Sequence, residues 1–219
     1  MGQLFKPGAD AILRLVLFLG GGTIVFALLF MAGLPRSDYW THVGMAANQP
    51  VPFSHAHHAG ELGIDCRYCH TTVETQATAG LPPTYTCMTC HSQIWTGAPM
   101  LAPVRDSLAG NAPLRWVRLN RLPDYVYFNH AIHLAKGIGC SSCHGAVDRM
   151  QLTYRVSAFK MAFCINCHRN PAGSVRPPEQ LWNMAWRPPD DQTAIGKQLV
   201  ARYHIRSPAL LTDCSICHR

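Results

Sequence analysis

The chain has 219 residues, which is enough for one or two domains. It contains 10 cysteines and 12 histidines, far more than ordinary usage, and its formal net charge is +7. All of the cysteines fall into pairs, so no single thiol is left over. A positive charge is typical of proteins that bind nucleic acid or an anionic surface, an interpretation that the cysteine motifs described below argue against.

An uncharged stretch lies near the start of the chain, LVLFLGGGTIVFALLFMAGL at residues 15–34. Twenty residues at about 1.5 Å each span about 30 Å, the thickness of a hydrocarbon core. A cleavable signal peptide has a shorter apolar core and a small-x-small site, whereas this stretch runs into Gly-Leu-Pro-Arg at residues 33–36. The sequence therefore predicts an anchor at residues 1–36 with a single transmembrane helix at about residues 13–34.

The charges around this stretch indicate its orientation. Lys6 and Arg14 precede the apolar residues, whereas Arg36 and Asp38 cancel each other after them. Basic residues concentrate on the cytoplasmic side of a membrane, so the N-terminus is predicted to be inside.

After the anchor, a Cys-x-x-Cys-His motif occurs five times and accounts for every cysteine. Two motifs follow a Phe-x-His-x-x-His opening in residues 53–97, and two more follow the same opening in residues 128–170. This is an internal duplication, and a fifth motif stands alone in residues 203–219. The motifs are Cys66-Arg-Tyr-Cys69-His70, Cys87-Met-Thr-Cys90-His91, Cys140-Ser-Ser-Cys143-His144, Cys164-Ile-Asn-Cys167-His168 and Cys214-Ser-Ile-Cys217-His218.

Cys-x-x-Cys-His is the attachment pattern of c-type haem. Two thiols on one helical turn can bond to the two vinyl groups of a porphyrin, and the adjacent histidine reaches the iron as proximal ligand. A disulfide framework leaves the histidines unexplained, and zinc ribbons share two cysteine pairs, which cannot divide five pairs evenly. The sequence predicts five covalently attached haem c groups, thioether bonds at all ten cysteines, and proximal ligands at His70, His91, His144, His168 and His218.

Haem attachment also bears on location and charge. Bacteria attach haem c outside the cytoplasm, so we expect residues 37–219 on the periplasmic face of the cytoplasmic membrane. Five haems bring about ten propionate carboxylates, which match the planar fork of arginine. Of the 19 basic residues 15 are arginines, so we expect a share of them to pair with propionates and predict no nucleic-acid partner.

Each iron needs a sixth ligand or an open site. The duplicated positions His55, His58, His130 and His133 are the best distal candidates, because residues three apart share a helix face but point in slightly different directions. One histidine of each pair can reach the first haem of its own unit, and the other can reach a different haem. Which histidine serves which haem stays open.

The fifth haem lacks a full copy of this opening. His204 lies ten residues before Cys214, as His130 does before Cys140, but Ser207 takes the place of the second histidine. We predict His204 as the distal ligand, with Met184 or Met161 as alternatives. His42 and His57 have no matching partner and are interpreted as solvated or hydrogen-bonded histidines.

Few residues serve each haem, too few for an ordinary protein core. The predicted fold class is a multihaem cytochrome c, mostly irregular with short α-helices packed around haems, preceded by one N-terminal transmembrane helix. Residues 97–113 and 171–191 are rich in proline and glycine and are expected to be ordered wrapping loops.

Phe-x-His-x-x-His ahead of Cys-x-x-Cys-His resembles class III multihaem cytochromes c, in which the two histidines ligate different haems. The segments GLPPTYTCMTCHSQIW, PLRWVRLNRLPDYVYFNHAIH and CINCHRNP, with five motifs and one membrane helix, resemble the pentahaem cytochrome subunit of bacterial alternative complex III. That resemblance implies quinol oxidation by a complex that passes electrons to periplasmic carriers. It also implies three partners: an integral-membrane quinol-binding subunit, an iron–sulfur subunit and a monohaem cytochrome or other soluble carrier.

Two functions compete. The chain is interpreted as a non-catalytic electron-transfer subunit with no catalytic residue of its own. The alternative is a quinol dehydrogenase or reductase acting by itself, which needs an open or labile iron position. The double histidines can fill at least four sixth positions, which favours electron transfer.

Overall fold

The structure is a computed structural model that describes residue 6 and residues 8–218; positions 1–5, 7 and 219 of the predicted ranges 1–36 and 203–219 lie outside the described residues. The chain divides into two compact units, Met1–Val43 and Gly44–Arg219.

The first unit contains the long helix α1 (Ala9–Gly33), which continues as the 3₁₀ turn η1 (Leu34–Arg36). Together they are 28 residues long with a mean hydropathy of 2.4 in the most apolar window, so by length and composition the helix can cross a membrane. The helix begins at Ala9 rather than near residue 13. Asp10 lies in its first turn and pairs with Arg14 at 2.8 Å, which favours helix at this end.

A short helix, α2 (Asp38–Thr41), follows within the same unit, capped by the hydroxyl of Ser37, which accepts from the Trp40 amide. Tyr39 and Trp40 are 74% and 59% exposed. Amphipathic aromatic rings of this kind concentrate at the boundary between hydrocarbon and water, directly beyond the end of a membrane helix.

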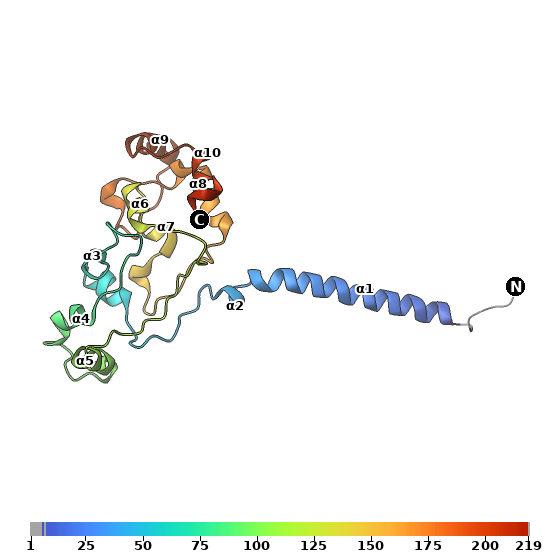
Figure 1. Cartoon of the computed structure of the whole chain (residues 1–219), viewed down its shortest axis with the longest axis horizontal. Helices are drawn as coiled ribbons and strands as arrows, with labels where there is room; N and C mark the ends of the chain where they lie inside the picture. Colours follow the sequence, from blue (N-terminus) through green and yellow to red (C-terminus); the bar gives the residue numbers. More distant parts are fainter. Residues whose placement is uncertain (1–5, 7, 219) are drawn as a thin grey trace. The chain divides into compact units, whose positions relative to one another are not determined.

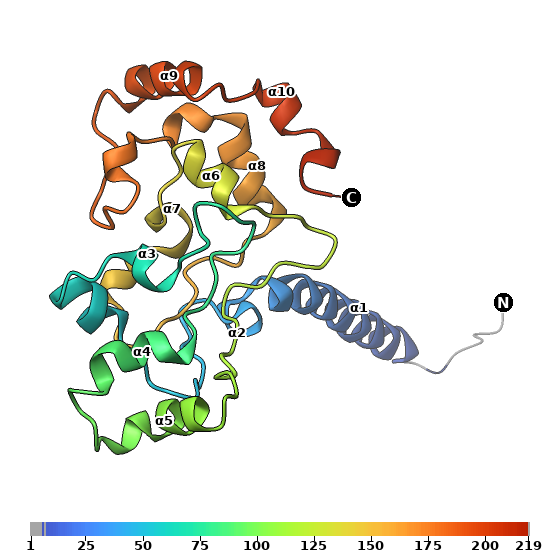
Figure 2. The same cartoon turned by 60° about the vertical axis from the view of Figure 1, so that its left-hand side comes forward.

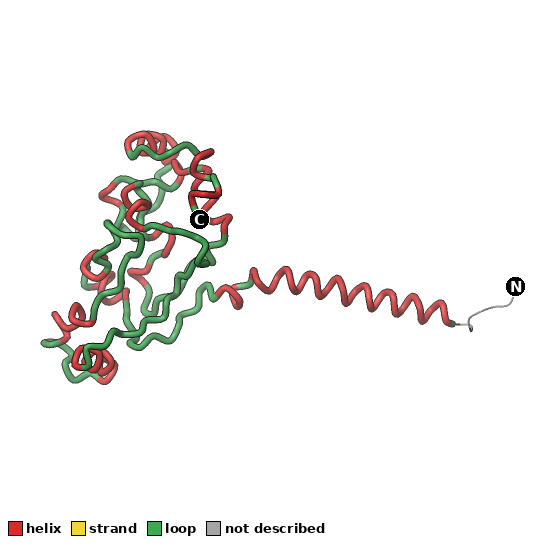
Figure 3. Tube along the Cα trace, in the orientation of Figure 1, coloured by secondary structure: helices red, strands yellow, loops and turns green. Residues whose placement is uncertain are grey.

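The second unit consists of short helices joined by irregular chain (Figures 1 and 3). Within the described residues there is no strand, and only two isolated β-bridges occur, Ala46 with Tyr154 and Val126 with His218. The predicted character of the fold, helical and otherwise irregular, is confirmed. The helices are η2 (Ala56–Glu61), α3 (Cys66–Cys69), α4 (Thr84–His91), η3 (Pro99–Leu101), α5 (Ala102–Ala109), α6 (His130–Ala135), α7 (Ser141–His144), η4 (Val147–Arg149), α8 (Met161–Arg169), η5 (Pro171–Gly173), η6 (Pro178–Gln180), α9 (Gln192–Arg202), α10 (Pro208–Leu211) and η7 (Cys214–Ile216).

The elements of this unit are spread along its length in an order that differs from the sequence. In both views α4 and α5 lie at one end, α9 and α10 at the other, and α3, α6 and α7 between them (Figures 1 and 2). α4 packs on α5, α8 on α10, and α9 on η5. The loops predicted to wrap the unit contain the short turns η3 and η5, and α5 forms within the first of them.

The apolar core of this unit is small. Its main cluster is built from Val51, Leu101 and Val104, with Trp116 packed against it. Among the described residues ten hydrophobic side chains are buried, too few to hold a unit of this size by apolar burial alone.

The two sequence repeats, residues 53–97 and 128–170, differ by one residue in the spacing between the first opening histidine and the first motif, and a π-helical turn accommodates the extra residue. His55 precedes Cys66 by eleven residues, whereas His130 precedes Cys140 by ten. In the first repeat, residues 53–97, the histidines lie at the start of η2, a π-helix, and the amide of Leu62 donates to His57 O at 3.0 Å. A π-turn accommodates one extra residue without a change at its ends.

Candidate haem-binding sites

Each motif forms one tight turn. The four motifs of the duplicated units lie on α3, α4, α7 and α8, and the fifth forms the 3₁₀ turn η7 instead of an α-helix. In the first, third and fifth motifs the amide of the motif histidine donates to the carbonyl of the first cysteine at 2.9 Å. The two thiols and the imidazole therefore share one face, as attachment to one planar group requires.

None of the ten thiols forms a disulfide. All ten cysteines are unpaired and at least partly accessible. Within residues 6 and 8–218, no three side chains of histidine, cysteine, aspartate and glutamate converge as a metal site.

In the second repeat, residues 128–170, each opening histidine faces a different motif histidine. The ring centroids of His130 and His144 are 6.3 Å apart with an interplanar angle of 7°. Those of His133 and His168 are also 6.3 Å apart, at 23°. Two imidazoles on opposite sides of one metal ion have ring centres roughly 6 Å apart, because each metal–nitrogen bond is about 2 Å long. Both pairs fit that spacing.

The first repeat, residues 53–97, shows the same arrangement. His58 and His91 have ring centroids 6.2 Å apart, with a steeper angle of 65°. His55 lies near His70: burial lowers the pKa of His55 to about 4, and the charge of His70 is the next cause. In both repeats, therefore, the first opening histidine lies near the histidine of the first motif, and the second opening histidine lies near the histidine of the second motif.

A phenylalanine fixes each histidine pair. Phe128 stacks on His133 at 4.4 Å and 25° and meets the edge of His130 at 4.8 Å. Phe53 makes the same two contacts in its own unit, at 4.4 Å and 4.9 Å. The conformation of the Phe-x-His-x-x-His opening is therefore repeated along with its sequence.

The Nδ1 atoms of most of these histidines are engaged, which leaves Nε2 available. When Nδ1 donates its proton to a carbonyl, Nε2 carries the lone pair that binds a metal, and such outer partners orient the ring. Backbone acceptors lie 2.7 to 3.3 Å away: Ser54 O for His58, Gly80 O for His70, Ile94 O for His91, Ala77 O for His130, Asn129 O for His133, Leu211 O for His168 and Tyr125 O for His218.

Two further histidines use side chains for the same purpose. His55 Nδ1 lies 2.7 Å from Thr153 Oγ1. His144 Nδ1 lies 3.1 Å from Asn120 Nδ2, and Asn120 Oδ1 is buried without a hydrogen-bond partner. The amide orientation that turns Oδ1 toward Nδ1 pairs this buried oxygen and makes Nδ1 the donor, as at the other sites. These partners have no sequence signature, and we did not predict them.

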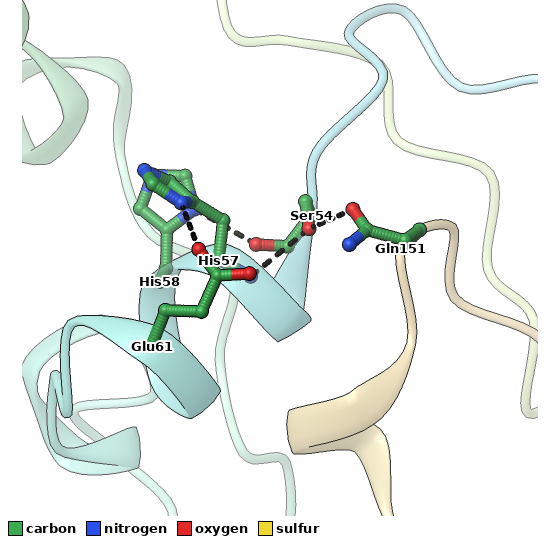
Figure 4. Close-up of polar contacts among 5 residues, drawn as sticks. All are labelled: Ser54, His57, His58, Glu61 and Gln151. Carbon is green, nitrogen blue, oxygen red and sulfur yellow. Dashed lines mark hydrogen bonds and ion pairs between the residues drawn. The ribbon is translucent and has the colours of Figure 1, made fainter.

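Figure 4 shows how the first opening is held. Ser54 O accepts from His58 Nδ1 at 2.8 Å, while Ser54 Oγ receives the His57 amide and donates to Gln151 Oε1 at 2.8 Å. His57 Nδ1 pairs instead with Glu61 at 2.8 Å. The hydrogen-bonded interpretation of His57 is thus confirmed, and Ser54 joins this opening to the segment after the third motif.

The candidates for the fifth site are not brought together in this way. His204 follows α9 with a left-handed backbone (φ 49°), and within the described residues its ring makes no contact with the ring of His218. Met184 is 8% exposed and belongs to the buried apolar residues, whereas Met161 is 66% exposed. His218 itself lies beside Tyr125, at 5.7 Å between ring centroids.

Comparison with known proteins places these features in context. No family model matches the chain. Over 136 residues it is 32% identical to a protein of Nitratidesulfovibrio vulgaris, the multiheme cytochrome c subunit of menaquinone reductase. The match covers 62% of this chain and 58% of that relative, so the chain spans less than two thirds of its length. The similarity supports a multihaem cytochrome c, in agreement with the five Cys-x-x-Cys-His motifs.

Proposed function

We propose that the chain is a membrane-anchored electron-transfer subunit that carries five covalently bound haem c groups. The observation that carries the proposal is the pairing of His130 with His144 and of His133 with His168 at one spacing, 6.3 Å. A pair of imidazoles with free Nε2 atoms at this distance suits a six-coordinate iron, which has no open position for a substrate.

The proposed ligands follow from the pairs. His55 and His70 hold the haem on Cys66 and Cys69, and His58 and His91 hold the haem on Cys87 and Cys90. In the second unit, His130 and His144 hold the haem on Cys140 and Cys143, and His133 and His168 hold the haem on Cys164 and Cys167. His218 is the proximal ligand of the haem on Cys214 and Cys217, and by sequence spacing His204 is its distal ligand.

When bound, each haem supplies an iron that gains or loses one electron. The chain's own residues keep that change reversible. The Nδ1 acceptors hold each imidazole in one orientation and tautomer, and the phenylalanines restrict the rings. Partial burial lowers the pKa of His55 and of His144 to about 4, which favours the neutral imidazole that binds a metal.

Contacts between motifs support an uninterrupted series of sites. Tyr68 OH meets Thr89 Oγ1 at 2.8 Å, and these residues lie inside the first and second motifs. Burial lowers the pKa of His144 to about 4, followed by the charges of His130 and His70, so the first and third motifs are neighbours.

The series continues toward the C-terminus. The third motif lies beside the fourth. Burial raises the pKa of the Cys143 thiol to about 11, and the next causes of that shift are the charges of the nearby Cys167 and Cys164. His168 Nδ1 donates to Leu211 O at 2.9 Å, close to the fifth motif. The proposed spatial order of haems is therefore second, first, third, fourth, fifth, and it differs from the order in the sequence.

Within this proposal the finer assignments follow the resemblance to alternative complex III. The chain serves a quinol:electron-acceptor oxidoreductase, beside an integral-membrane quinol-binding subunit and an iron–sulfur subunit. It passes electrons to a monohaem cytochrome or another soluble periplasmic carrier. α1 anchors it in the cytoplasmic membrane with its N-terminus inside and the haem unit outside.

A second candidate differs in direction. The relative's name is that of a menaquinone reductase, which favours electron flow toward the quinone. Quinol oxidation by the membrane complex, with the haems followed spectroscopically, separates the two: reduction of the haems by added quinol supports the first, and their oxidation by added menaquinone supports the second.

The haem content and ligation test the core of the proposal. The purified chain is expected to carry five haems by haemochrome assay and to show a low-spin spectrum. A carbon monoxide difference signal limited to at most one haem is expected, because four sites have paired histidines. A high-spin, carbon monoxide-reactive majority, or quinol oxidation by the chain without partners, would favour the self-sufficient enzyme.

A further inference from the structure

The largest fully buried side chain among the described residues is a cation, Arg176, which is 2% exposed. It lies in the loop between η5 and η6, which follows the fourth motif and is distant in sequence from the third. A guanidinium stays charged in proteins, so its burial is costly unless an anion compensates it.

The guanidinium is directed at the third motif. Its Nη2 donates to Ser142 Oγ at 2.7 Å and its Nη1 to Ser141 Oγ at 3.1 Å. These serines are the two residues between Cys140 and Cys143. Longer contacts from Nη1 reach backbone carbonyls of Gln180 and Asn183, at 3.3 and 3.4 Å.

All of these partners are neutral. The ion pairs among the described residues include none to Arg176, and its Nε is buried without a hydrogen-bond partner. Burial lowers the pKa of Arg176, and the groups that oppose this effect are the Cys140 and Cys143 thiols of the third motif, not a carboxylate. The charge is thus held close to the third motif without a counter-ion from this part of the chain.

The surrounding chain is shaped to hold the guanidinium there. Gly139, directly before the motif, has no side chain, and a Cβ at that position would lie 2.6 Å from Arg176 Cζ. The ring of Trp186 covers the other side at 4.2 Å. The backbone of Arg176 is fixed as well, because its amide donates to Gly137 O at 2.9 Å and its carbonyl accepts from Tyr203 OH at 3.2 Å.

We propose that Arg176 raises the reduction potential of the haem on Cys140 and Cys143, and so makes the middle site of the series easier to reduce. The inference rests on the proposed function. Ferric iron carries one more positive charge than ferrous iron, and a fixed cation in a buried, weakly screening environment disfavours the more positive state. The electron that reduces this iron comes from a neighbouring haem of the same chain.

The test is a spectroelectrochemical titration of the full, haem-loaded chain at about pH 6, chosen because burial lowers the pKa of a substituted lysine and a lower pH favours its protonated form. Arg176→Gln is expected to shift one of the five midpoint potentials downward. Arg176→Lys, which keeps the charge, is expected to leave that midpoint near the wild-type value. Arg187→Gln removes an exposed arginine from the following loop, between η6 and α9, and serves as the matched control, with all midpoints unchanged.

Five unchanged midpoints in haem-loaded Arg176→Gln would overturn the inference. An equal downward shift in Arg176→Lys would also overturn it, because the effect would then follow from packing rather than charge. If Arg176→Gln does not assemble with its haems, Arg176→Met serves as the second neutral variant: one lowered midpoint supports the inference, and five unchanged midpoints overturn it. A wild-type chain without five haems would instead contradict the proposed function.

Discussion

The imidazole rings of His130 and His144 lie parallel, within 7°, with centroids 6.3 Å apart. The equally spaced pair of His133 and His168 starts only three residues further along the same helix, α6, and reaches a different motif. One short helix therefore contributes to two sites, and its position fixes the separation of the two proposed haems.

The first prediction tests this division of ligands. His133→Ala is expected to leave the haem on Cys164 and Cys167 without its sixth ligand, and that haem becomes high-spin and binds carbon monoxide. His168→Ala removes the opposite ligand of the same haem. The double variant His133→Ala/His168→Ala should therefore perturb a single haem, whereas His130→Ala/His168→Ala should perturb two.

The carbon monoxide difference spectrum, calibrated against total haem, gives these counts. His57→Ala is the matched control, since His57 lies next to a ligand position but pairs with Glu61. Equal counts in the two double variants would mean that the histidines of α6 do not serve different haems.

The second prediction concerns the hydrogen bond to His144. An acceptor at Nδ1 makes the opposite nitrogen more electron-rich and stabilises the ferric state. Asn120→Leu removes this acceptor and is expected to raise the midpoint potential of the haem on Cys140 and Cys143. Asn48→Leu, at an exposed position, is the control. An unchanged or lowered midpoint in a redox titration would contradict the assigned role of Asn120.

The third prediction is that a favourable helix substitution destabilises the protein. Alanine suits a helix interior better than glycine by about 1 kcal/mol. At Gly196, within α9, however, a Cβ would lie 1.9 Å from the carbonyl oxygen of Ala172. Overpacking against backbone costs typically about 1–3 kcal/mol, and so close a contact belongs at the upper end. Because the better helix propensity of alanine offsets about 1 kcal/mol of this cost, Gly196→Ala is expected to lower the free energy of unfolding by about 2 kcal/mol.

Thermal unfolding of the haem-loaded chain measures this difference. Gly97→Ala is the control, because a Cβ at Gly97 has nothing within 4 Å. A higher melting temperature for Gly196→Ala would show that α9 moves away from η5 at little cost.

The fourth prediction is a pH dependence at the first motif. Asp65 caps α3 by accepting from the Arg67 amide at 2.8 Å, and its side chain also receives the Arg67 guanidinium. The hydrogen bond from the Arg67 side chain lowers the pKa of Asp65. Because the folded value lies below the unfolded one, the stabilisation is present above the unfolded pKa, near 3.8, and is lost as the pH falls through the folded value.

Asp65→Asn should remove this acid-dependent part of stability while the chain above about pH 5 changes by less than about 1 kcal/mol, since the pair is largely exposed. Urea unfolding between about pH 2 and 6 measures it, with the exposed Asp124→Asn as control. Parallel pH curves for Asp65→Asn and the wild type would exclude a role of this carboxylate in acid stability.

The sequence by itself determined the chemistry that the sites can have. The five Cys-x-x-Cys-His motifs and the repeated Phe-x-His-x-x-His opening are local patterns, and local spacing decides which thiols and imidazoles share one turn. The apolar stretch ending near Gly33 likewise determined its helix, because its length and lack of charge are properties of consecutive residues.

Only the tertiary structure decided which histidine faces which motif, because that depends on chain segments distant in sequence. The partners of His55 and His144, Thr153 and Asn120, come from remote loops, and most other Nδ1 acceptors are backbone carbonyls, which every residue possesses. The approach of Arg176 to Ser142 depends on a missing side chain at Gly139, and a lone glycine in a sequence does not reveal what fills its space.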